Sequence, residues 1–271
     1  MKNFVISVSN AFQRRAHIEN EFSAKAVEFE FFDAVVPATV EATARALGLD
    51  PGKTDLHQLE VACLLSHVAL WKKATDDQLD YICIFEDDIH LGEQAHTFLM
   101  DSSWIPMQCG LIKMEVRYKK ILTMIDPPAI KLQNKRKLLV LGAAHMGCGG
   151  YILSREVACE LLDFTIRCQQ LNSVDHIVFK NYPKDTGQKV YQMAPALCIQ
   201  DIVLTGDHTR FPSYLENVRN MRKGENWPKK RLSNAGKLQR EVARSFAQMT
   251  HTFQEQMQLF QGKRVVRMKF R

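Results

Sequence analysis

Three consecutive carboxylates, Glu86, Asp87 and Asp88, directly follow the apolar run from Tyr81 to Phe85. A short apolar run that ends at a polar break predicts a strand buried on both faces, as in a parallel sheet. Ligands bind at the carboxyl ends of strands in open α/β sheets, so these acids stand where a ligand is expected. Their mutual repulsion favours a bound divalent cation, because oxygen ligands select Mg²⁺, Ca²⁺ or Mn²⁺. The alternative is a solvated turn that ends the strand and caps the next helix.

Two further positions have types suited to chemistry, and each has a plain structural alternative. Arg14 follows the first predicted strand, where it can contact a phosphate or a base edge, or lie on a solvated helix face. Asp175 stands at the predicted start of a helix. It is either a first-turn acid stabilised by the helix dipole or a general base presented beside the ligand edge of the sheet.

A predicted helix over residues 56–75 carries three polar groups among apolar positions, Glu60, Ser66 and His67. Such side chains commonly make buried hydrogen bonds, and a single histidine in a helix is usually structural. His208 offers a metal or phosphate ligand or lies in an exposed turn.

Glycines are concentrated in the segment 142–150, which ends in Gly149 and Gly150 and allows close backbone approach to a ligand. The segment lacks the GxGxxG pattern that opens a helix, which excludes a dinucleotide fingerprint.

Alternating strand and helix patterns surround these groups and predict an α/β fold. The strand 4–8, a helix from Arg14 to about Lys25 and the strand 29–35 form a predicted βαβ unit with parallel strands. Further strands are expected at residues 110–114, 138–141, 151–153, 189–193 and 196–200, and further helices between residues 37 and 55, after Ser154 as N-cap and from Asn172.

Composition indicates a soluble, cytoplasmic protein. The 271 residues are 46% hydrophobic and 24% charged, enough to bury a large core. No apolar run approaches the roughly 20 residues of a membrane span, and the first residues lack the apolar stretch of a secretory signal. The seven cysteines contain no CxxC pair and favour reduced thiols over a disulfide frame or a zinc site.

Positive charge is concentrated at the end of the chain. From Arg210 onward there are fifteen Lys/Arg and four Asp/Glu, a balance of +11 against +6 for the whole chain. The sequence therefore predicts a body, residues 1–210, and a basic, largely helical extension, residues 211–271, that meets an anionic partner.

The extension has a single apolar stripe at helical period after a capping Ser233. It consists of Leu238, Val242, Phe246, Met249, Phe253, Met257 and Phe260. Such a stripe packs on the protein's own body, on a second copy in a homodimer or on a membrane surface. The final residues 263–271 mix basic and apolar side chains, which suits an anionic bilayer surface. Nucleic acid is disfavoured as a partner because the extension lacks the interleaved aromatics of a stacking platform.

The order of these pieces resembles the family 25 glycosyltransferases, which include bacterial lipooligosaccharide galactosyltransferases. The resemblance covers about residues 1–205. It rests on the segments 4–8, Arg14-Arg15, 31–35, Glu60-Val61-Ala62-Cys63-Leu64-Leu65-Ser66-His67 with Trp71, Phe85-Glu86-Asp87-Asp88, 149–154 and Asp175. Two departures, Ala62 where the family often has glycine and Phe85 where an aliphatic residue is common, remove no chemical group.

The resemblance implies a GT-A-like, Rossmann-type nucleotide-sugar-binding fold and an inverting sugar transfer. It implies that Asp88 binds Mn²⁺ or Mg²⁺, with Glu86 beside it. His208, which lies beyond the resemblance, is the further metal ligand that the sequence itself offers. A second set of residues is implied to contact the nucleotide sugar: Ser7, Val8, Arg14, Ser66, Glu86, Asp87, Gly149 and Gly150. Asp175 is the first candidate for the base that accepts the proton of the attacking hydroxyl, with Glu60 and His67 as the next.

The expected function is therefore a metal-dependent UDP-sugar glycosyltransferase. It is expected to move galactose from UDP-galactose to lipooligosaccharide in a β linkage, as a peripheral protein on the cytoplasmic face of the bacterial inner membrane. A hydrolase of nucleotide sugars or phosphate esters using the same acids is the alternative enzyme. A nucleic-acid-binding protein led by the basic extension is the alternative of another class.

Overall fold

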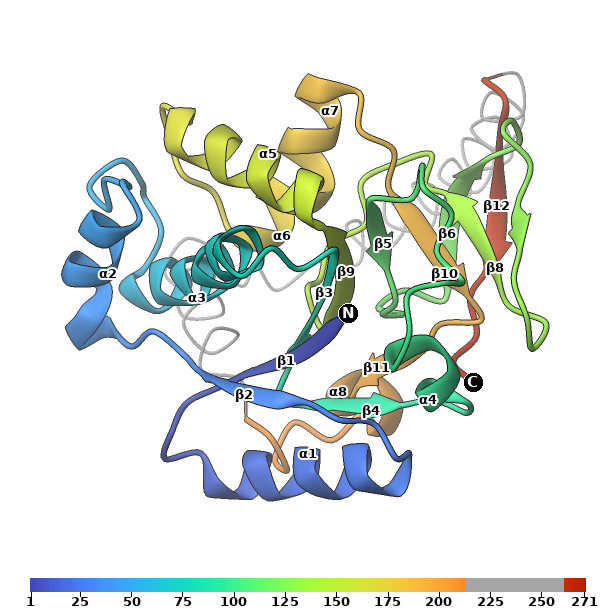
Figure 1. Cartoon of the computed structure of the whole chain (residues 1–271), viewed down its shortest axis with the longest axis horizontal. Coiled ribbons are helices and arrows are strands. Elements are labelled where there is room, and N and C mark those ends of the chain that lie inside the picture. Colours follow the sequence, from blue (N-terminus) through green and yellow to red (C-terminus); the bar gives the residue numbers. More distant parts are fainter. Residues whose placement is uncertain (213–260) are drawn as a thin grey trace, which may run out of the picture.

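An eight-stranded sheet organises the computed structural model, which describes residues 1–212 and 261–271 (Figure 1). Its strand order is β2-β1-β3-β9-β5-β10-β8-β7. The strands are β1 (Lys2–Ser7), β2 (Glu30–Asp33), β3 (Tyr81–Glu86), β5 (Leu111–Lys113), β7 (Ile130–Lys131), β8 (Lys137–Val140), β9 (Gly150–Ser154) and β10 (Tyr191–Ala194). Two smaller sheets pair β4 (Ile89–Leu91) with β11 (Cys198–Gln200), and β6 (Lys120–Met124) with β12 (Lys263–Arg267).

Helices cover both faces of the main sheet, which gives the predicted α/β, Rossmann-type class (Figure 1). The helices are α1 (Phe12–Ala24), α2 (Val40–Ala46), α3 (Gln58–Asp76), α4 (Ala95–Leu99), α5 (Arg155–Arg167), α6 (Val174–His176), α7 (Tyr182–Thr186) and α8 (Asp201–Thr205), with a 3₁₀ turn at Pro37–Thr39 and a π-helical turn at Ile177–Asn181. Ser154 caps α5 as predicted, because its Oγ accepts a hydrogen bond of 3.2 Å from the Val157 N–H.

The central strand β3 is buried on both faces, as its apolar run predicts. Ile82 and Ile84 enter the core beneath α3 and α5, whereas Cys83 and Phe85 enter the core shared with α1 and α4. All four side chains are fully buried. The strand therefore holds its terminal carboxylates on a rigid support.

The sheet is mixed rather than purely parallel. The β1 strand runs parallel to β2, as the βαβ prediction requires, and also parallel to β3. On its other side β3 pairs antiparallel with β9, which enters the sheet from the opposite direction. The parallel setting expected for β3 therefore holds on one side only, because an apolar run reports burial and not the direction of adjacent strands.

The end of the chain returns to the body. Residues 263–267 form β12, which pairs antiparallel with β6, and Met268 is buried beside Ile121. These residues form a strand, since each pairs with a residue of β6 and the segment contains two β-branched valines.

The predicted helix after Ser233 and its apolar stripe lie outside the described residues, so the division of the chain at residue 210 and the homodimer stay predictions. Within residues 1–212 and 261–271, no helix has both the length and the apolar character needed to cross a bilayer.

Candidate active site

The first nucleotide-binding candidates meet at the ends of β1 and β3. Asp87 follows β3 directly, and its Oδ2 accepts a hydrogen bond of 2.7 Å from the Ser7 hydroxyl. Its Oδ1 pairs with the Arg14 guanidinium, which α1 carries to the same place. Val8 lies beside them with its carbonyl bonded to the Ala11 N–H at 2.9 Å. The sheet and the first helix therefore bring together Ser7, Val8, Arg14 and Asp87 from distant parts of the sequence.

Glu86 and Asp88 lie on either side of one amide group. The Gln200 Nε2 donates to Glu86 Oε2 at 2.8 Å and to Asp88 Oδ1 at 3.3 Å. Gln200 is itself held by Arg117, whose Nη1 lies 2.8 Å from its side-chain oxygen. Arg14 approaches Asp88 to 3.8 Å. Two carboxylates thus share a few donors in a largely buried setting.

This crowding raises the pKa of both acids. Burial, with the charges of Asp88 and Glu115 next, raises the pKa of Glu86 to about 8. Burial likewise raises the pKa of Asp88 to about 6, although the nearby Arg14 opposes the shift. A group that is costly to ionise without a counter-charge is a good ligand for a cation.

A third carboxylate, Glu115, was missed by the sequence reasoning. It is fully buried after β5, where its Oε2 accepts bonds of 3.0 Å from Lys113 Nζ and from the Gly149 N–H. Its Oε1 has no hydrogen-bond partner in the part of the chain that the structure describes. The signal was available, because Glu115 follows a predicted strand just as Glu86 ends β3.

The two glycines let these elements approach closely. A Cβ on Gly149 would lie 3.0 Å from side-chain carbons of Gln200 and Glu115, and a Cβ on Gly150 would lie 2.3 Å from the Cys198 sulfur. Any larger residue would push the acid-bearing strands apart. The predicted contact of Gly149 and Gly150 with a nucleotide sugar stays a prediction.

Glu86, Asp88 and Glu115 form what we call the acid cluster, and His67 lies beside its Glu86. One of its ring nitrogens, a carboxylate oxygen of Glu86 and the Cys63 sulfur all lie within 4.8 Å of one another. The Trp71 N–H donates to the Tyr151 hydroxyl at 3.0 Å, and that hydroxyl lies 2.8 Å from His67 Nδ1. Burial lowers the pKa of His67 to about 3, so the ring is neutral. Its Nε2 has no partner among the described residues.

The other polar residues of α3 hold structure. The Ser66 hydroxyl donates to the Ala62 carbonyl at 2.8 Å and accepts from the Val35 N–H at 2.9 Å. Glu60 Oε2 accepts from the His57 N–H at 3.1 Å and closes the first turn of the helix. These contacts support a positioning role for both side chains, and their direct roles at a substrate stay predictions.

Asp175 lies in the first turn of α6, as predicted. Its Oδ1 accepts bonds of 2.6 Å from the Ser173 hydroxyl and 3.0 Å from the His176 N–H. Its Oδ2 faces the Gly147 N–H at 3.4 Å, and its charge acts on His67. The side chain is 18% exposed, so its carboxylate is oriented by neighbours and still reachable.

Comparison with known proteins decides the family. The family described as "Glycosyltransferase family 25 (LPS biosynthesis protein)" matches residues 1–178, which include the acids of β3 and Asp175. The chain belongs to glycosyltransferase family 25.

Relatives within the family extend the similarity along the chain. The chain is 35% identical to the lacto-N-neotetraose biosynthesis glycosyltransferase LgtE of Neisseria gonorrhoeae, over 74% of this chain and 75% of that protein. It is 34% identical to LgtB of the same organism, over 84% and 85%. The lipooligosaccharide biosynthesis protein lex-1 of Haemophilus influenzae is 26% identical over 98% of both chains. The similarity to lex-1 therefore includes the C-terminal segment.

The donor set of this family 25 member fits a hard divalent cation. Glu86 and Asp88 supply carboxylate oxygens. The charge of the fully buried Glu115 acts on both of them, and its Oε1 has no hydrogen-bond partner among the described residues. His208 is exposed in the turn after α8. Its role as a metal ligand stays a prediction.

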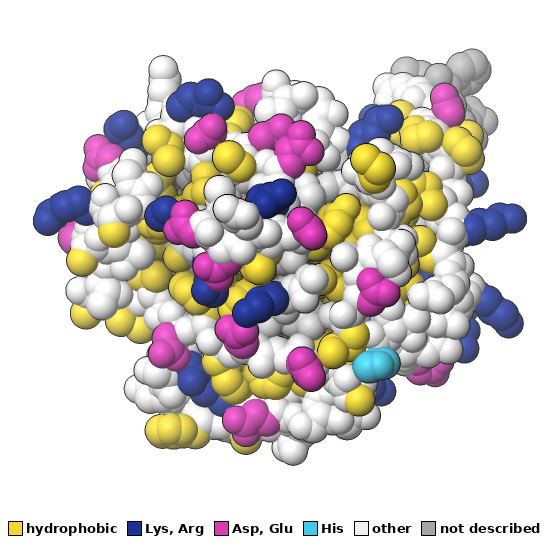
Figure 2. Space-filling view, in the orientation of Figure 1, with side chains coloured by type: hydrophobic (Ala, Val, Ile, Leu, Met, Phe, Trp, Pro, Cys, Tyr) yellow, Lys and Arg dark blue, Asp and Glu magenta, His cyan; other side chains and the backbone are white. Residues whose placement is uncertain are grey.

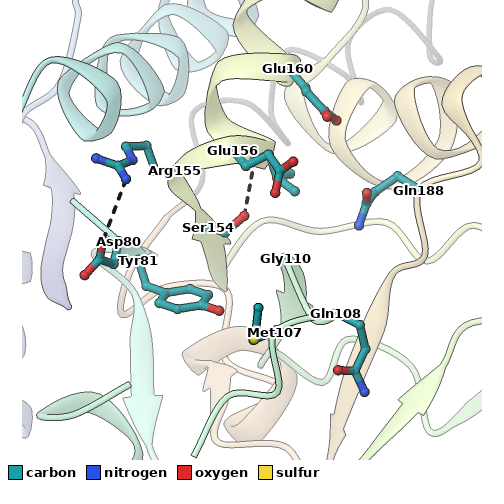
Figure 3. Close-up of a pocket in the computed structure, with 11 residues that line it drawn as sticks. Asp80, Tyr81, Met107, Gln108, Gly110, Ser154, Arg155, Glu156, Glu160 and Gln188 are labelled. Carbon is teal, nitrogen blue, oxygen red and sulfur yellow. Dashed lines mark hydrogen bonds and ion pairs between the residues drawn. The ribbon is translucent and has the colours of Figure 1, made fainter. Parts of the chain in front are cut away.

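A pocket of about 410 Å³ lies away from these acids. Asp80 and Tyr81 line it at the start of β3, with Glu156 and Glu160 from α5 and Gln188 across from them (Figure 3). At about 3.3 Å per residue, the length of β3 puts Tyr81 roughly 17 Å from Glu86. The candidate active site is therefore the acid-bearing end of the sheet and not this pocket.

Proposed function

We propose that this family 25 glycosyltransferase moves galactose from UDP-galactose to a lipooligosaccharide acceptor, with inversion to a β linkage. The resemblance implies the donor and the stereochemistry, and the similarity to the lipooligosaccharide biosynthesis protein lex-1 supports the acceptor class. The observation that carries the proposal is the group of half-buried Glu86 and Asp88 with fully buried Glu115, next to Asp87 and its partners Arg14 and Ser7.

Glu86 and Asp88 would hold Mn²⁺ or Mg²⁺, with Glu115 in the same group. When bound, the cation supplies positive charge for the diphosphate leaving group. Arg14 adds a fixed positive charge next to the same place, and Ser7 and Asp87 orient it. The nucleotide then binds across the ends of β1 and β3, which is the ligand edge of a Rossmann-type sheet.

Asp175 acts as the base that accepts the proton of the attacking acceptor hydroxyl. Ser173 and the backbone of residues 147 and 176 hold its carboxylate in one orientation. The neutral His67 is fully buried beside Glu86 and supports the acid-bearing strand from within the core, while Glu60 and Ser66 hold α3 in place.

The basic β6–β12 sheet supports the proposed contact with an anionic membrane surface. Exposed Lys120, Arg264 and Arg267 lie on it, and exposed Lys269 follows β12. Lys and Arg side chains project along the edge of the molecule that carries β12 (Figure 2). Each base near an anionic surface contributes on the order of 1 kcal/mol. A peripheral location on the cytoplasmic face of the inner membrane fits this surface. Sedimentation with anionic vesicles, but not with neutral ones, is the expected result.

The decisive experiment is a screen of UDP-sugars with a truncated lipooligosaccharide and Mn²⁺. We expect transfer from UDP-galactose and a loss of about 10³-fold or more in Asp88→Ala, because charge on the leaving group is no longer neutralised. Asp76→Ala is the matched control, since Asp76 is an exposed acid in an i,i+4 pair with Lys72.

Three results would contradict the proposal. Full activity in Asp88→Ala would remove the metal site, and transfer from another UDP-sugar would replace galactose as the donor. Release of UDP that does not rise when acceptor is added would favour a nucleotide-sugar hydrolase.

A further inference from the structure

A second group of ionisable side chains lies outside the acid cluster, between α1 and β4. His17 and Glu21 are one helical turn apart on α1, and His90 is the central residue of β4. One ring nitrogen of each histidine and one carboxylate oxygen of Glu21 all lie within 4.8 Å of one another. The His90 and Glu21 side chains are 14% and 24% exposed, so a solvated ion can reach them.

The hydrogen bonds of His17 leave one ring nitrogen available. Its Nε2 lies 2.9 Å from the Ile89 carbonyl oxygen, which only accepts, so Nε2 carries the hydrogen. Nδ1 then keeps its lone pair. Histidines that bind metals usually donate their other ring N–H to a carbonyl or a carboxylate, and His17 already does so.

His90 has the same arrangement with a carboxylate. Its Nε2 lies 2.8 Å from Asp201 Oδ1, and its Nδ1 faces Glu21 Oε1 at 3.2 Å. Two ligand atoms bound to one zinc ion at about 2.0–2.2 Å are roughly 3.4 Å apart in tetrahedral geometry. The His90–Glu21 contact is therefore close to the spacing of two ligands on one ion, and ion binding would release the proton between them to solvent.

Asp201 is the independent observation. Its side chain is 1% exposed, and Oδ1 also accepts from Arg210 Nη1 at 2.9 Å. Its Oδ2 has no partner within residues 1–212 and 261–271. A buried carboxylate behind a histidine is the arrangement that raises the basicity of a metal-binding ring.

We propose that His17, Glu21 and His90 bind a divalent transition-metal ion of the zinc class, with Asp201 as the carboxylate that orients His90. A set of two imidazoles and one carboxylate selects such an ion, whereas the all-oxygen group at Glu86 and Asp88 selects Mn²⁺ or Mg²⁺. The ion would fix α1 against β4. Because α1 carries Arg14 and β4 follows Asp88, it would stabilise the frame of the candidate active site without touching substrate.

The test is titration of the chelator-treated full-length protein with Zn²⁺, followed by calorimetry. We expect one Zn²⁺ site in the wild type, and affinity at least tenfold weaker in Glu21→Gln, which keeps an oxygen to accept the Leu91 N–H. Glu19→Gln removes the same charge from an exposed position on the same helix and should bind as the wild type does.

Other possible zinc sites are separated by two more variants. Asp88→Ala tests the acid cluster, and Cys63→Ser tests the group of Cys63, His67 and Glu86. Both should keep the site. Asp201→Asn should weaken Zn²⁺ binding by about 10–100-fold while circular dichroism shows an unchanged fold.

The proposal is overturned if the wild type binds no Zn²⁺, which would make His90 a protonated bridge between two acids. It is equally overturned if Glu21→Gln binds as tightly as Glu19→Gln, or if Asp88→Ala or Cys63→Ser abolishes binding. Because Zn²⁺ binding is measured without substrate, loss of transferase activity in Asp88→Ala does not affect the result.

Discussion

Two clusters of ionisable groups lie on either side of the β3–β4 turn, and they are built in opposite ways. In the acid cluster, Glu86, Asp88 and Glu115 have few donors to share, and the pKa values of Glu86 and Asp88 rise as a result. In the histidine cluster, which consists of His17, Glu21 and His90, the His90 ring stands between the carboxylates of Glu21 and Asp201, and these contacts raise the pKa of His90.

The difference shows what each cluster needs. In the histidine cluster both histidines have hydrogen-bond partners and each carboxylate faces a ring nitrogen of His90, so the group is stable as it stands. The acid cluster has excess negative charge in a buried place, which is unfavourable unless a cation arrives. Unbalanced buried charge, as in the acid cluster, is typical of a ligand-binding site.

The largest of these effects is expected at Asp175, the proposed base. Asp175→Asn should lower kcat by about 10²–10⁴-fold, because the amide cannot accept the hydroxyl proton. Its hydrogen bonds to Ser173 and His176 can be kept by the remaining oxygen, so the unfolding temperature should hardly change. Initial rates with UDP-galactose and acceptor measure the effect, with the exposed Asp185→Asn as the control. Near-normal turnover would move the base to Glu60 or His67.

The next prediction tests whether Lys113 and Glu115 balance each other's charge. Glu115→Gln leaves the fully buried Lys113 without its carboxylate at 3.0 Å, and should lower the free energy of unfolding by about 3–5 kcal/mol. The double variant Lys113→Met/Glu115→Gln should recover much of that loss, since no unpaired charge remains. Urea denaturation of the two variants and of Lys113→Met measures the coupling. Additive losses would mean that the pair does not act as a unit.

A third prediction uses pH to separate the two clusters. The folded-state pKa of Glu86 is raised from 4.5 to about 8 and that of Asp88 from 3.8 to about 6. The folded protein therefore holds these protons more tightly than the unfolded chain. Their destabilising effect is absent below the ordinary values and grows as pH rises, reaching its full size above about 8 for Glu86.

Chelator-treated protein should accordingly unfold at a temperature several degrees lower at pH 9 than at pH 6, for an effect of a few kcal/mol. His90 contributes in the same direction, because its pKa is also raised. Glu86→Gln isolates the acid cluster and should flatten the dependence, as should added Mn²⁺. A slope unchanged by both would mean that the histidine cluster and other groups control the pH dependence.

Much of the fold could be predicted from the sequence, and so could the part of the site that is local. The apolar run of β3 and the acids after it are adjacent in the chain, so their burial and position followed from the pattern alone. Gln200 and Arg117 could not be predicted, because β11 and the segment after β5 reach Glu86 only through the fold. The antiparallel β9 was missed for the same reason, since strand direction is set by tertiary connections.

Glu115 and the histidine cluster teach different lessons. Glu115 follows a predicted strand, so applying to it the reasoning used for Glu86 would have found it. His17, Glu21 and His90 come from a helix and a strand about seventy residues apart, and nothing in either segment signals the other. The return of residues 263–267 to β6 is likewise a long-range pairing.

The smallest expected effect compares two arginines that share one aromatic ring. Arg14 lies 5.5 Å and Arg210 4.9 Å from the centre of the Phe211 ring, and each pairs with a buried aspartate. Asp201 keeps His90 when Arg210 is lost, so Arg210→Ala should change activity less than about threefold and stability by less than about 1 kcal/mol.

Arg14→Ala should have a larger effect on both, because Asp87 and Asp88 lose the one cation that the described residues place against them. Parallel measurement of KM for the donor and of the unfolding temperature in the two variants tests the contrast. Equal effects would mean that both arginines serve mainly to pack against Phe211. The negative charge of Asp87 and Asp88 would then not depend on Arg14. A large effect of Arg210→Ala alone would mean that the histidine cluster, through Asp201, depends more on its arginine than the acid cluster does. That result would reverse the comparison between the two clusters.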